Sequence, residues 1–364
     1  MKKYVLLNPG PVNITESVRK ALVGEDICHR EEEFSHLLQE IRRKILKIYN
    51  LDSKRYTTVI LTSSGTGAVE ASICSCVPED KILFVISNGI YGERMIQIAN
   101  AYKIPVKSVI YKWGEKINLS EIEDILKSDK DSKIYAIAIV HHETTTGLLN
   151  PLDKVGTLAK KYNKILIVDA VSSFGGEEIN FDNWGIDVVS STANKCIHSV
   201  PGCAFVILKN SLIDAMKDIS PRNIYLNLLT YHNLQEKGIP PFTPAIQVMY
   251  AFNQALDEFL EEGIEGRVKR YKKLSLLARK KAKEIGLKML LDEKDYSNTL
   301  TSFYLPDNIS YEFLHDELKK RGFIIYAGQA GLKNKIFRIA NMGNIKEEDI
   351  ERLFENIYEI INKK

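Results

Sequence analysis

Short apolar stretches alternate with amphipathic ones along the first part of the chain. Seven of them are apolar almost throughout and predict strands, at 58–62, 81–86, 106–111, 134–140, 165–168, 188–190 and 203–208. Apolar positions at three- and four-residue steps predict a helix before the first strand, over 34–48, and further helices at 65–77, 91–102, 119–126 and 152–162. Apolar strands separated by helices are typical of parallel sheets covered on both faces. The pattern therefore predicts an α/β fold with a mostly parallel seven-stranded sheet.

The pattern changes after the proline-rich segment 240–244. Long helices are predicted at 245–262 and 266–285, followed by strands at 300–304 and 336–339 that mix with helices at 311–321 and 346–362. We predict three parts: an irregular N-terminal arm over 1–15 with a turn at Pro9-Gly10-Pro11, a large domain over 16–264, and a smaller C-terminal α+β domain over 265–364.

Composition narrows the classes of function. Hydrophobic residues make up 45% and charged residues 27% of the chain, and the net charge is +3. These values indicate a globular protein that binds neither nucleic acid nor an anionic membrane. Because no apolar stretch approaches the ~18 residues of a membrane-spanning helix and the N-terminal apolar run is too short for a signal peptide, we expect a cytoplasmic protein. The five cysteines form no disulfide or zinc pattern, and no metal site is expected.

Two residues 26 positions apart carry the strongest chemical signal. Asp169 ends the apolar run 165–168, and Lys195 lies in a small, polar segment just after the strand 188–190. Ligands of open α/β sheets bind at the carboxyl ends of the strands, where both residues are expected. A lysine that forms a Schiff base and an acid that holds a pyridinium N–H are the minimum requirement for pyridoxal phosphate. Taken alone, the pair is equally compatible with a salt-bridged aspartate and an ordinary surface lysine.

Three further strand ends are rich in binding groups. Ser64-Gly65-Thr66 joins a strand to a helix and offers free N–H groups and hydroxyls to a phosphate, without the Walker or dinucleotide glycine pattern. Tyr91 can stack on a flat ring, and Thr145 can bind a ring oxygen. Taken singly, these features also suit a tight turn, a core aromatic residue and a polar strand exit.

The order of these motifs along the chain is more specific than any single motif. Pro-Gly-Pro, Ser-Gly-Thr-Gly-Ala, Asn-Gly-Ile-Tyr-Gly-Glu-Arg, His-Glu-Thr-Thr-Thr-Gly, Val-Asp-Ala-Val-Ser-Ser-Phe-Gly-Gly and Asn-Lys-Cys-Ile follow one another from residue 9 to residue 197. In this order they resemble the class V branch of the fold-type-I pyridoxal-phosphate-dependent aminotransferases, and the resemblance covers nearly the whole chain. It implies a homodimer with shared active sites.

The resemblance also implies roles for individual residues. Lys195 would bind the cofactor covalently and move a proton during catalysis, and Asp169 would keep the pyridine nitrogen protonated. Thr243 would reach the cofactor phosphate of the neighbouring subunit. The complete cofactor-binding set is Ser64, Gly65, Thr66, Tyr91, Thr145, Asp169, Thr192, Lys195 and Thr243.

The most specific part of the resemblance indicates the substrate. The segments 26–31 and 193–202 resemble class V enzymes that transfer the amino group of 2-aminoethylphosphonate to pyruvate, which implies phosphonoacetaldehyde and L-alanine as products. Arg338 would clamp the carboxylate of the substrate. Pro9 and Gly10 would also contribute to substrate binding, and Arg30 is expected near this turn. We expect Arg30 to bind the phosphonate, because this dianion needs a further cation; the alternative is an exposed residue paired with Glu31–Glu33.

Three alternatives stay open at this stage. Asn8 and the pair His198-Ser199 depart from the pattern of the phosphonate enzymes, so another class V aminotransferase is possible, of the alanine–glyoxylate or serine–pyruvate type or acting on a related phosphorylated amine. A cysteine desulfurase is disfavoured, because Asn194 stands where that group has histidine. A non-catalytic homologue would have no chemical need for both Lys195 and Asp169.

Overall fold

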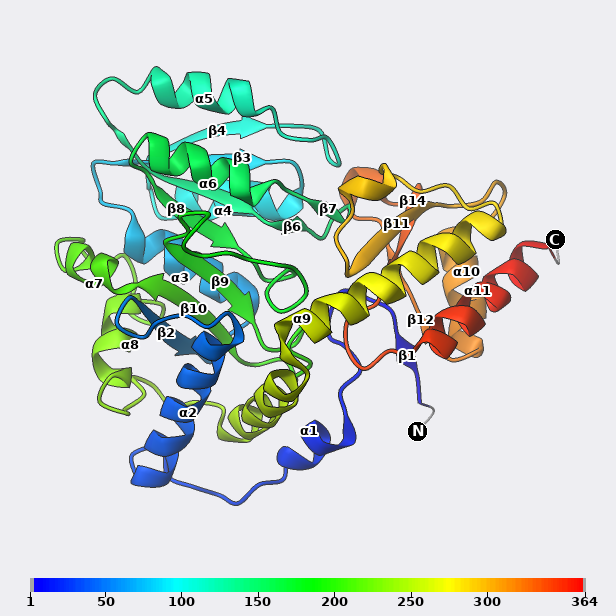
Figure 1. Cartoon of the computed structure of the whole chain (residues 1–364), viewed down its shortest axis with the longest axis horizontal. Coiled ribbons are helices and arrows are strands. Elements are labelled where there is room, and N and C mark those ends of the chain that lie inside the picture. The colour runs from blue at the N-terminus through cyan, green and yellow to red at the C-terminus, as the bar shows by residue number, and fades with distance from the viewer. Residues whose placement is uncertain (1–2, 363–364) are drawn as a thin grey trace.

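The chain folds into two lobes joined by one long helix (Figure 1). A computed structural model describes residues 3–362. The larger lobe is built on a sheet with the strand order β2-β10-β9-β8-β5-β3-β4. These strands are β2 (Tyr56–Leu61), β3 (Ile82–Ser87), β4 (Val106–Ile110), β5 (Ile134–Val140), β8 (Ile165–Asp169), β9 (Val188–Thr192) and β10 (Ala204–Lys209). The predicted α/β fold with a seven-stranded sheet is confirmed.

Strand direction agrees with the prediction, with one exception. All neighbouring pairs among β9, β8, β5, β3 and β4 are parallel, whereas β10 runs antiparallel to both β9 and β2. The strands that precede the candidate residues therefore end at one edge of the sheet, the edge that faces the smaller lobe in Figure 1.

Two apolar cores cover the two faces of this sheet. On one face, alternate strand residues such as Phe84 and Ile137 pack against α2, α5, α6 and the first part of α9. On the other face, their neighbours, such as Val85 and Ala136, pack against α3, α4, α7 and α8. The helices are α2 (Glu32–Ile48), α3 (Gly65–Cys76), α4 (Ile90–Ala101), α5 (Leu119–Lys127), α6 (Leu152–Lys161), α7 (Asn210–Met216), α8 (Leu228–Gln235) and α9 (Ile246–Glu284). Because both faces are buried, the strands contain few polar positions.

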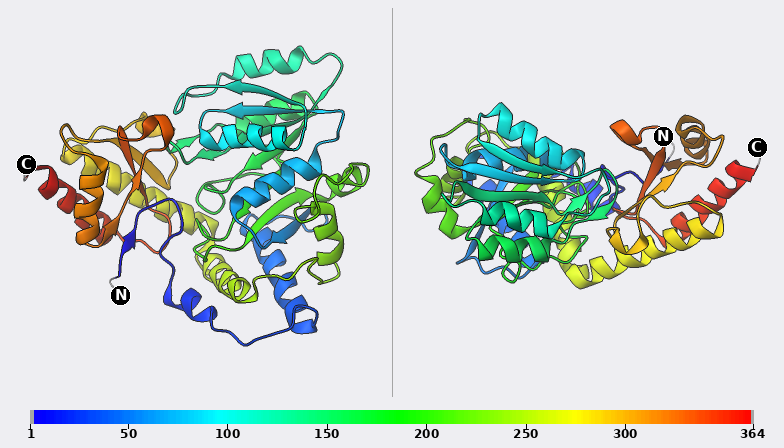
Figure 2. Two further views of the ribbon diagram at one scale, coloured as in Figure 1. Left: turned by 180° about the vertical axis from the view of Figure 1, so that it is seen from behind. Right: turned by 90° about the horizontal axis from the view of Figure 1, so that it is seen from above.

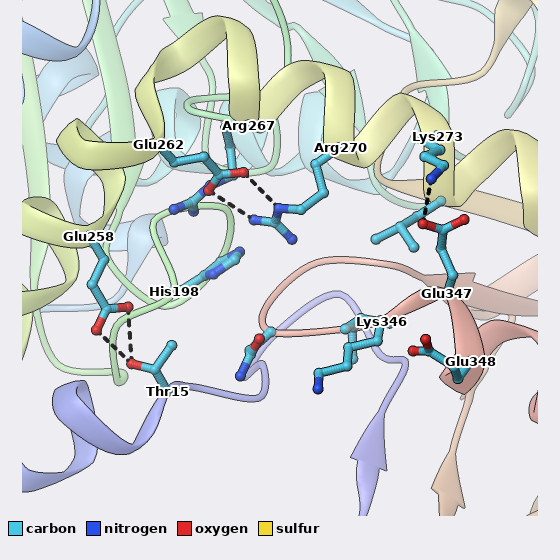
Figure 3. A pocket seen from close by; sticks show the side chains of 13 residues that line it. Thr15, His198, Glu258, Glu262, Arg267, Arg270, Lys273, Lys346, Glu347 and Glu348 are labelled. Atoms are coloured by element: carbon cyan, nitrogen blue, oxygen red, sulfur yellow. Dashed lines mark hydrogen bonds and ion pairs between the residues drawn. The ribbon is translucent and has the colours of Figure 1, made fainter.

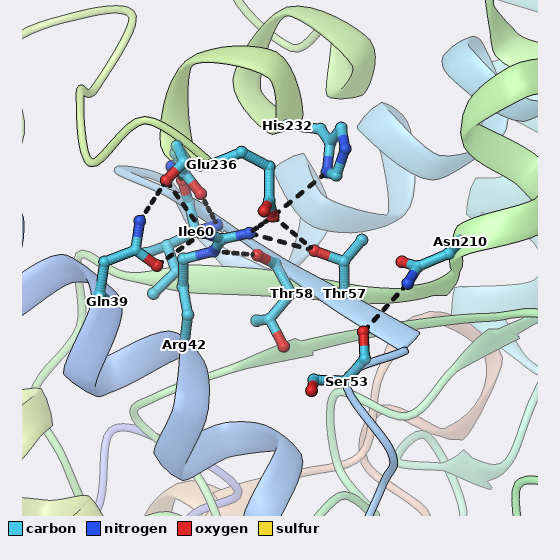
Figure 4. A network of polar contacts seen from close by, with 10 residues as sticks. Gln39, Arg42, Ser53, Thr57, Thr58, Ile60, Asn210, His232 and Glu236 are labelled. Atoms are coloured by element: carbon cyan, nitrogen blue, oxygen red, sulfur yellow. Dashed lines mark hydrogen bonds and ion pairs between the residues drawn. The ribbon is translucent and has the colours of Figure 1, made fainter. Parts of the chain in front are cut away.

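Side chains of neighbouring helices form hydrogen bonds with the backbone of the edge strand β2 (Figure 4). Gln235, at the end of α8, accepts from the amide of Ile60 (2.9 Å) and donates to its carbonyl (2.7 Å), as a neighbouring strand would. Nε of Arg42 donates to the Thr58 carbonyl (2.8 Å), and the same guanidinium pairs with Glu236. Three backbone groups on this edge, which would otherwise be open to pairing with another strand, are thus satisfied within the chain.

The smaller lobe takes residues from both ends of the chain. Its elements are β11 (Leu300–Tyr304), β13 (Tyr326–Ala327) and β14 (Ile336–Ala340) in one sheet, together with α10 (Tyr311–Lys320), α11 (Glu347–Asn362) and the second part of α9. The N-terminal strand β1 (Val5–Leu6) pairs in parallel with β12 (Phe323–Ile324). The prediction of an irregular arm over 1–15 was wrong here, because a two-residue strand is too short to show a period. The helix α1 (Glu16–Ala21) follows the arm.

The helix α9 runs from one lobe to the other (Figure 2). Its backbone leaves helical geometry at Gly263, where φ is 72°. This break lies between the two helices predicted at 245–262 and 266–285, and next to the predicted domain boundary. No helix within residues 3–362 has the length and apolar character needed to cross a bilayer.

Candidate active site

Lys195 lies where the two lobes meet, in the turn that follows β9. Its Nζ donates to Oγ of Ser172 (2.7 Å) and lies 5.8 Å from the centroid of the Tyr91 ring. Burial lowers the pKa of Lys195 to about 8, while the charge of Asp169 acts in the opposite direction. A substantial fraction of this amine is therefore neutral near physiological pH and can act as a nucleophile.

Asp169 is the last residue of β8 and is buried. Its Oδ1 accepts from the amide of Val171 (2.9 Å). Burial raises the pKa of Asp169, and the charges of Lys195 and Arg94 oppose this rise. The structure thus brings together the two residues that the sequence singled out, as an acid and an amine within electrostatic reach of each other.

A second buried carboxyl group, Glu143, belongs to the hairpin formed by β6 (His142–Glu143) and β7 (Leu148–Leu149). Its Oε1 accepts from both the amide (3.0 Å) and the hydroxyl (2.5 Å) of Thr145, whose Oγ1 in turn accepts from the amide of Ile90 (3.1 Å). Its Oε2 is buried without a hydrogen-bond partner. Burial, followed by the charge of Asp169, raises the pKa of Glu143 to about 7. Thr145 therefore holds the first turn of α4, which carries Tyr91.

The predicted phosphate cup lies at the amino end of α3. Ser64 is the N-cap residue but its side chain makes no capping bond, so the first amides of α3 remain available. Gly65 is required here, because a Cβ would lie 2.8 Å from Val171 and 3.4 Å from Cβ of Thr192. Thr66 accepts a hydrogen bond from Nη1 of Arg94 (3.1 Å). The structure thus brings Gly65, Thr66 and Thr192 into one small region.

The N-terminal turn packs directly on the lysine. Gly10 has a φ of 107°, and a Cβ at this position would lie 3.2 Å from Cγ of Lys195. The predicted nearness of Pro9 and Gly10 to the site is therefore reproduced. A side chain at residue 10 would displace the lysine as well as strain the backbone.

Arg338, on β14, is 1% exposed. Nε donates to the carbonyl of Ala327 (2.9 Å) and Nη1 to the carbonyl of Thr144 (2.8 Å), while Nη2 has no partner. Burial lowers the pKa of Lys195, and the charge of Arg338 adds to this; burial raises the pKa of Tyr91, and the same charge opposes that rise. Two backbone carbonyls thus fix the guanidinium, and one N–H₂ group remains free for a ligand.

The turn that carries Lys195 is also contacted by residues that line a cavity of about 450 Å³ (Figure 3). Nη1 of Arg267, on α9, donates to the carbonyl of Cys196 (2.7 Å), and the same guanidinium pairs with Glu262. His198 is in contact with the Tyr271 hydroxyl and accepts from the amide of Gly343 (3.1 Å). Contacts from the small-lobe part of α9 therefore set the position of the turn that carries Lys195.

Two predicted site residues are not brought to Lys195 within one chain. Arg30 is exposed, and its Nη1 donates to the carbonyl of Pro240 (3.1 Å). Thr243 is exposed three residues further along the same segment. The two residues thus lie near each other, in a region that also includes the exposed Ile239, the neighbour of Pro240 in the chain.

Sequence reasoning missed three groups at the site: Ser172, Glu143 and Arg94. Ser172 follows Asp169 by three residues, and its hydroxyl also shares a hydrogen bond with Thr144 (2.5 Å). Glu143 and Arg94 belonged to motifs that were recognised, the His-Glu-Thr-Thr-Thr-Gly and Gly-Ile-Tyr-Gly-Glu-Arg segments. For Glu143 and Arg94, the signal in the sequence was a charged residue within a motif whose other residues were already assigned to the site.

Comparison with known proteins identifies the class. The family described as Aminotransferase class-V matches residues 16–353. The chain therefore belongs to the class V aminotransferases, as its motifs indicated.

More particular relatives share most of the chain. It is 41% identical over 361 residues to a 2-aminoethylphosphonate–pyruvate transaminase of Bacillus cytotoxicus, covering 98% of this chain and 97% of the relative. It is 40% identical to a bifunctional phosphonoacetaldehyde hydrolase/aminoethylphosphonate transaminase of Clostridioides difficile, of which it spans only 57%. A solved alanine–glyoxylate aminotransferase of Nostoc sp. superposes with a TM-score of 0.93 at 26% identity, covering 99% of this chain and 96% of that one.

Proposed function

We propose that the protein is a transaminase that binds pyridoxal phosphate and transfers the amino group of 2-aminoethylphosphonate to pyruvate. The products would be phosphonoacetaldehyde and L-alanine. The observation that carries the proposal is the juxtaposition of Lys195 and Asp169 at the carboxyl edge of the sheet. The relatives of about 41% identity that bear this activity in their names support the choice of substrate.

The residues present fit this cofactor. A half-buried lysine of lowered pKa suits an aldehyde, and a buried carboxyl group at the end of β8 suits a ring N–H. The uncapped amino end of α3 suits a phosphate, and the Tyr91 ring beside Lys195 suits a flat heterocycle. Together these elements supply one group for each chemical feature of pyridoxal phosphate.

The cofactor, when bound, supplies an electron sink for the carbanion that forms on loss of a substrate proton. Lys195 would be the base that removes this substrate proton, and Ser172 orients the Nζ of Lys195 through a hydrogen bond. Asp169 would stabilise positive charge on the ring nitrogen, since a carboxylate shielded from water interacts strongly with a nearby cation. Glu143 holds Thr145, and thereby the turn of α4 that bears Tyr91.

Arg338 would bind the carboxylate of pyruvate and alanine through its free Nη2. The phosphonate needs additional positive charge, which we assign to Arg30 of the neighbouring subunit in a homodimer. This assignment is supported by the position of Arg30 beside the segment of Thr243, away from its own lysine. A homodimer with shared sites, a cytoplasmic location and the domain boundaries at 15/16 and 264/265 remain predictions.

The test is a set of single half-reactions. The protein loaded with pyridoxal phosphate is mixed separately with 2-aminoethylphosphonate, phosphoethanolamine, L-alanine and L-serine, and the loss of the protein-bound cofactor absorbance is followed. We expect conversion by 2-aminoethylphosphonate and by L-alanine. Conversion by L-alanine or L-serine without 2-aminoethylphosphonate would retain the transaminase and refute the phosphonate substrate.

A further inference from the structure

Arg94 is a cation without an acidic partner at the proposed cofactor site. It lies on the first turns of α4, three residues after Tyr91, and is half-buried. Its Cζ lies 4.8 Å from the centroid of the Tyr91 ring, and its Nη1 donates to Oγ1 of Thr66 (3.1 Å). Within residues 3–362 it forms no ion pair, and the neighbouring Glu93 accepts instead from Nε1 of Trp113 (2.6 Å).

The groups around Arg94 increase the positive electrostatic potential instead of neutralising the charge of its guanidinium. The amino end of α3, which includes Thr66, carries the positive end of the helix dipole and lacks a side-chain cap. A partly buried guanidinium next to such an end is unfavourable unless an anion neutralises both. Burial raises the pKa of both Asp169 and Tyr91, and the positive charge of Arg94 opposes each of these rises, which shows that Arg94 acts on the interior of the site.

The hydrogen bond to Thr66 has a direct chemical consequence. Because Oγ1 of Thr66 accepts from Arg94, the proton of this hydroxyl points elsewhere and can be donated to an anion at the same helix end. Arg94, Thr66 and the free amides of α3 thus supply both charge and donors to one point.

We propose that Arg94 neutralises the phosphate dianion of the cofactor, which it reaches beside Thr66 at the amino end of α3. This inference rests on the proposed function, because it assigns a residue to the same site. The substrate phosphonate has the same chemistry, but the bond to Thr66 favours the cofactor phosphate. Arg94 is thereby a cofactor-binding residue in addition to those predicted from the sequence.

The experiment compares two ligands that differ only in the phosphate. Dissociation constants of pyridoxal phosphate and of pyridoxal are measured on the cofactor-free protein, on Arg94→Met and Arg94→Lys, and on Glu93→Gln as a control for charge removal at the adjacent position. We expect Arg94→Met to weaken pyridoxal phosphate about 10- to 100-fold, the range of a charge-assisted hydrogen bond, and pyridoxal less than about twofold. Arg94→Lys should fall between wild type and Arg94→Met, and Glu93→Gln should match wild type.

Several outcomes would overturn the inference. Equal weakening of both ligands would indicate a structural role, and an unchanged affinity for pyridoxal phosphate would remove Arg94 from the phosphate site. A defect confined to the 2-aminoethylphosphonate half-reaction, with L-alanine unaffected, would place Arg94 at the substrate phosphonate. If the wild-type protein bound no pyridoxal phosphate, the proposed function itself would fail, which is distinct from each of these results.

Discussion

The lowered pKa of Lys195 predicts how fast the protein captures its cofactor at each pH. Only the neutral amine attacks an aldehyde, and burial lowers the pKa of Lys195 to about 8 from an ordinary value of 10.5. At pH 7.5, about one molecule in four then has a neutral lysine, compared with about one in a thousand for an unperturbed side chain. The rate of the covalent reaction is proportional to the fraction of neutral amine. The structure therefore predicts that Lys195 reacts with pyridoxal phosphate more than about 100-fold faster than an exposed lysine would.

The assay is stopped-flow absorbance of the cofactor-free protein mixed with saturating pyridoxal phosphate between pH 6 and pH 10. The rate should rise with pH and level off above a midpoint near 8. Lys195→Ala should bind the cofactor without the covalent absorbance change. A midpoint near 10.5, or the same profile in Lys195→Ala, would refute the reasoning, because the reacting amine would not be the buried one.

Three further predictions concern the other charged groups. Arg338→Lys should raise the KM for pyruvate about 10- to 100-fold with unchanged cofactor affinity, because a single ammonium nitrogen cannot reproduce the planar fork in which Nε and Nη1 bond the two carbonyls and Nη2 faces the ligand; an unchanged KM would contradict this. Glu143 has its pKa raised to about 7, so the folded protein keeps this proton between about pH 4.5 and 7 while the unfolded chain loses it, and stability falls by about 3 kcal/mol over that range. Glu143→Gln cannot ionise, so thermal unfolding between pH 5 and 8 should show the variant gaining on wild type as pH rises; parallel curves would exclude this. Mixed dimers of Arg30→Ala and Lys195→Ala subunits should regain 2-aminoethylphosphonate activity that neither homodimer has, whereas an Arg30 acting within its own subunit would leave them inactive.

The large sheet was predictable because burial on both faces leaves a simple trace in the sequence. Most strand positions are apolar, and each intervening helix shows its period, so α2 to α6 and the seven strands follow from local pattern. The helices α7 and α8 were missed, because their short segments carry little amphipathic signal. The strand β1 was missed because its partner Phe323 lies more than 300 residues away.

The candidate site was predictable where it depends on strand ends. Asp169 and Lys195 follow parallel strands, and parallel strands place their carboxyl ends together. Arg94 and Ser172 depend instead on which loops meet in space, which no spacing along the chain reveals. Arg30 lies in the connection between α1 and α2, whose path is set by tertiary contacts such as the bond to Pro240.

The pairing of β1 with β12 has a consequence for how the protein is made. Leu7, just after β1, belongs to the same apolar core as Phe354 of α11, so the segment around residue 7 finds these partners only after the segment around residue 354 has been synthesised. Until then, the turn at Gly10 cannot be anchored against the lysine. The large lobe can thus form before the small lobe, whereas the proposed cofactor site is completed only when both lobes are in place.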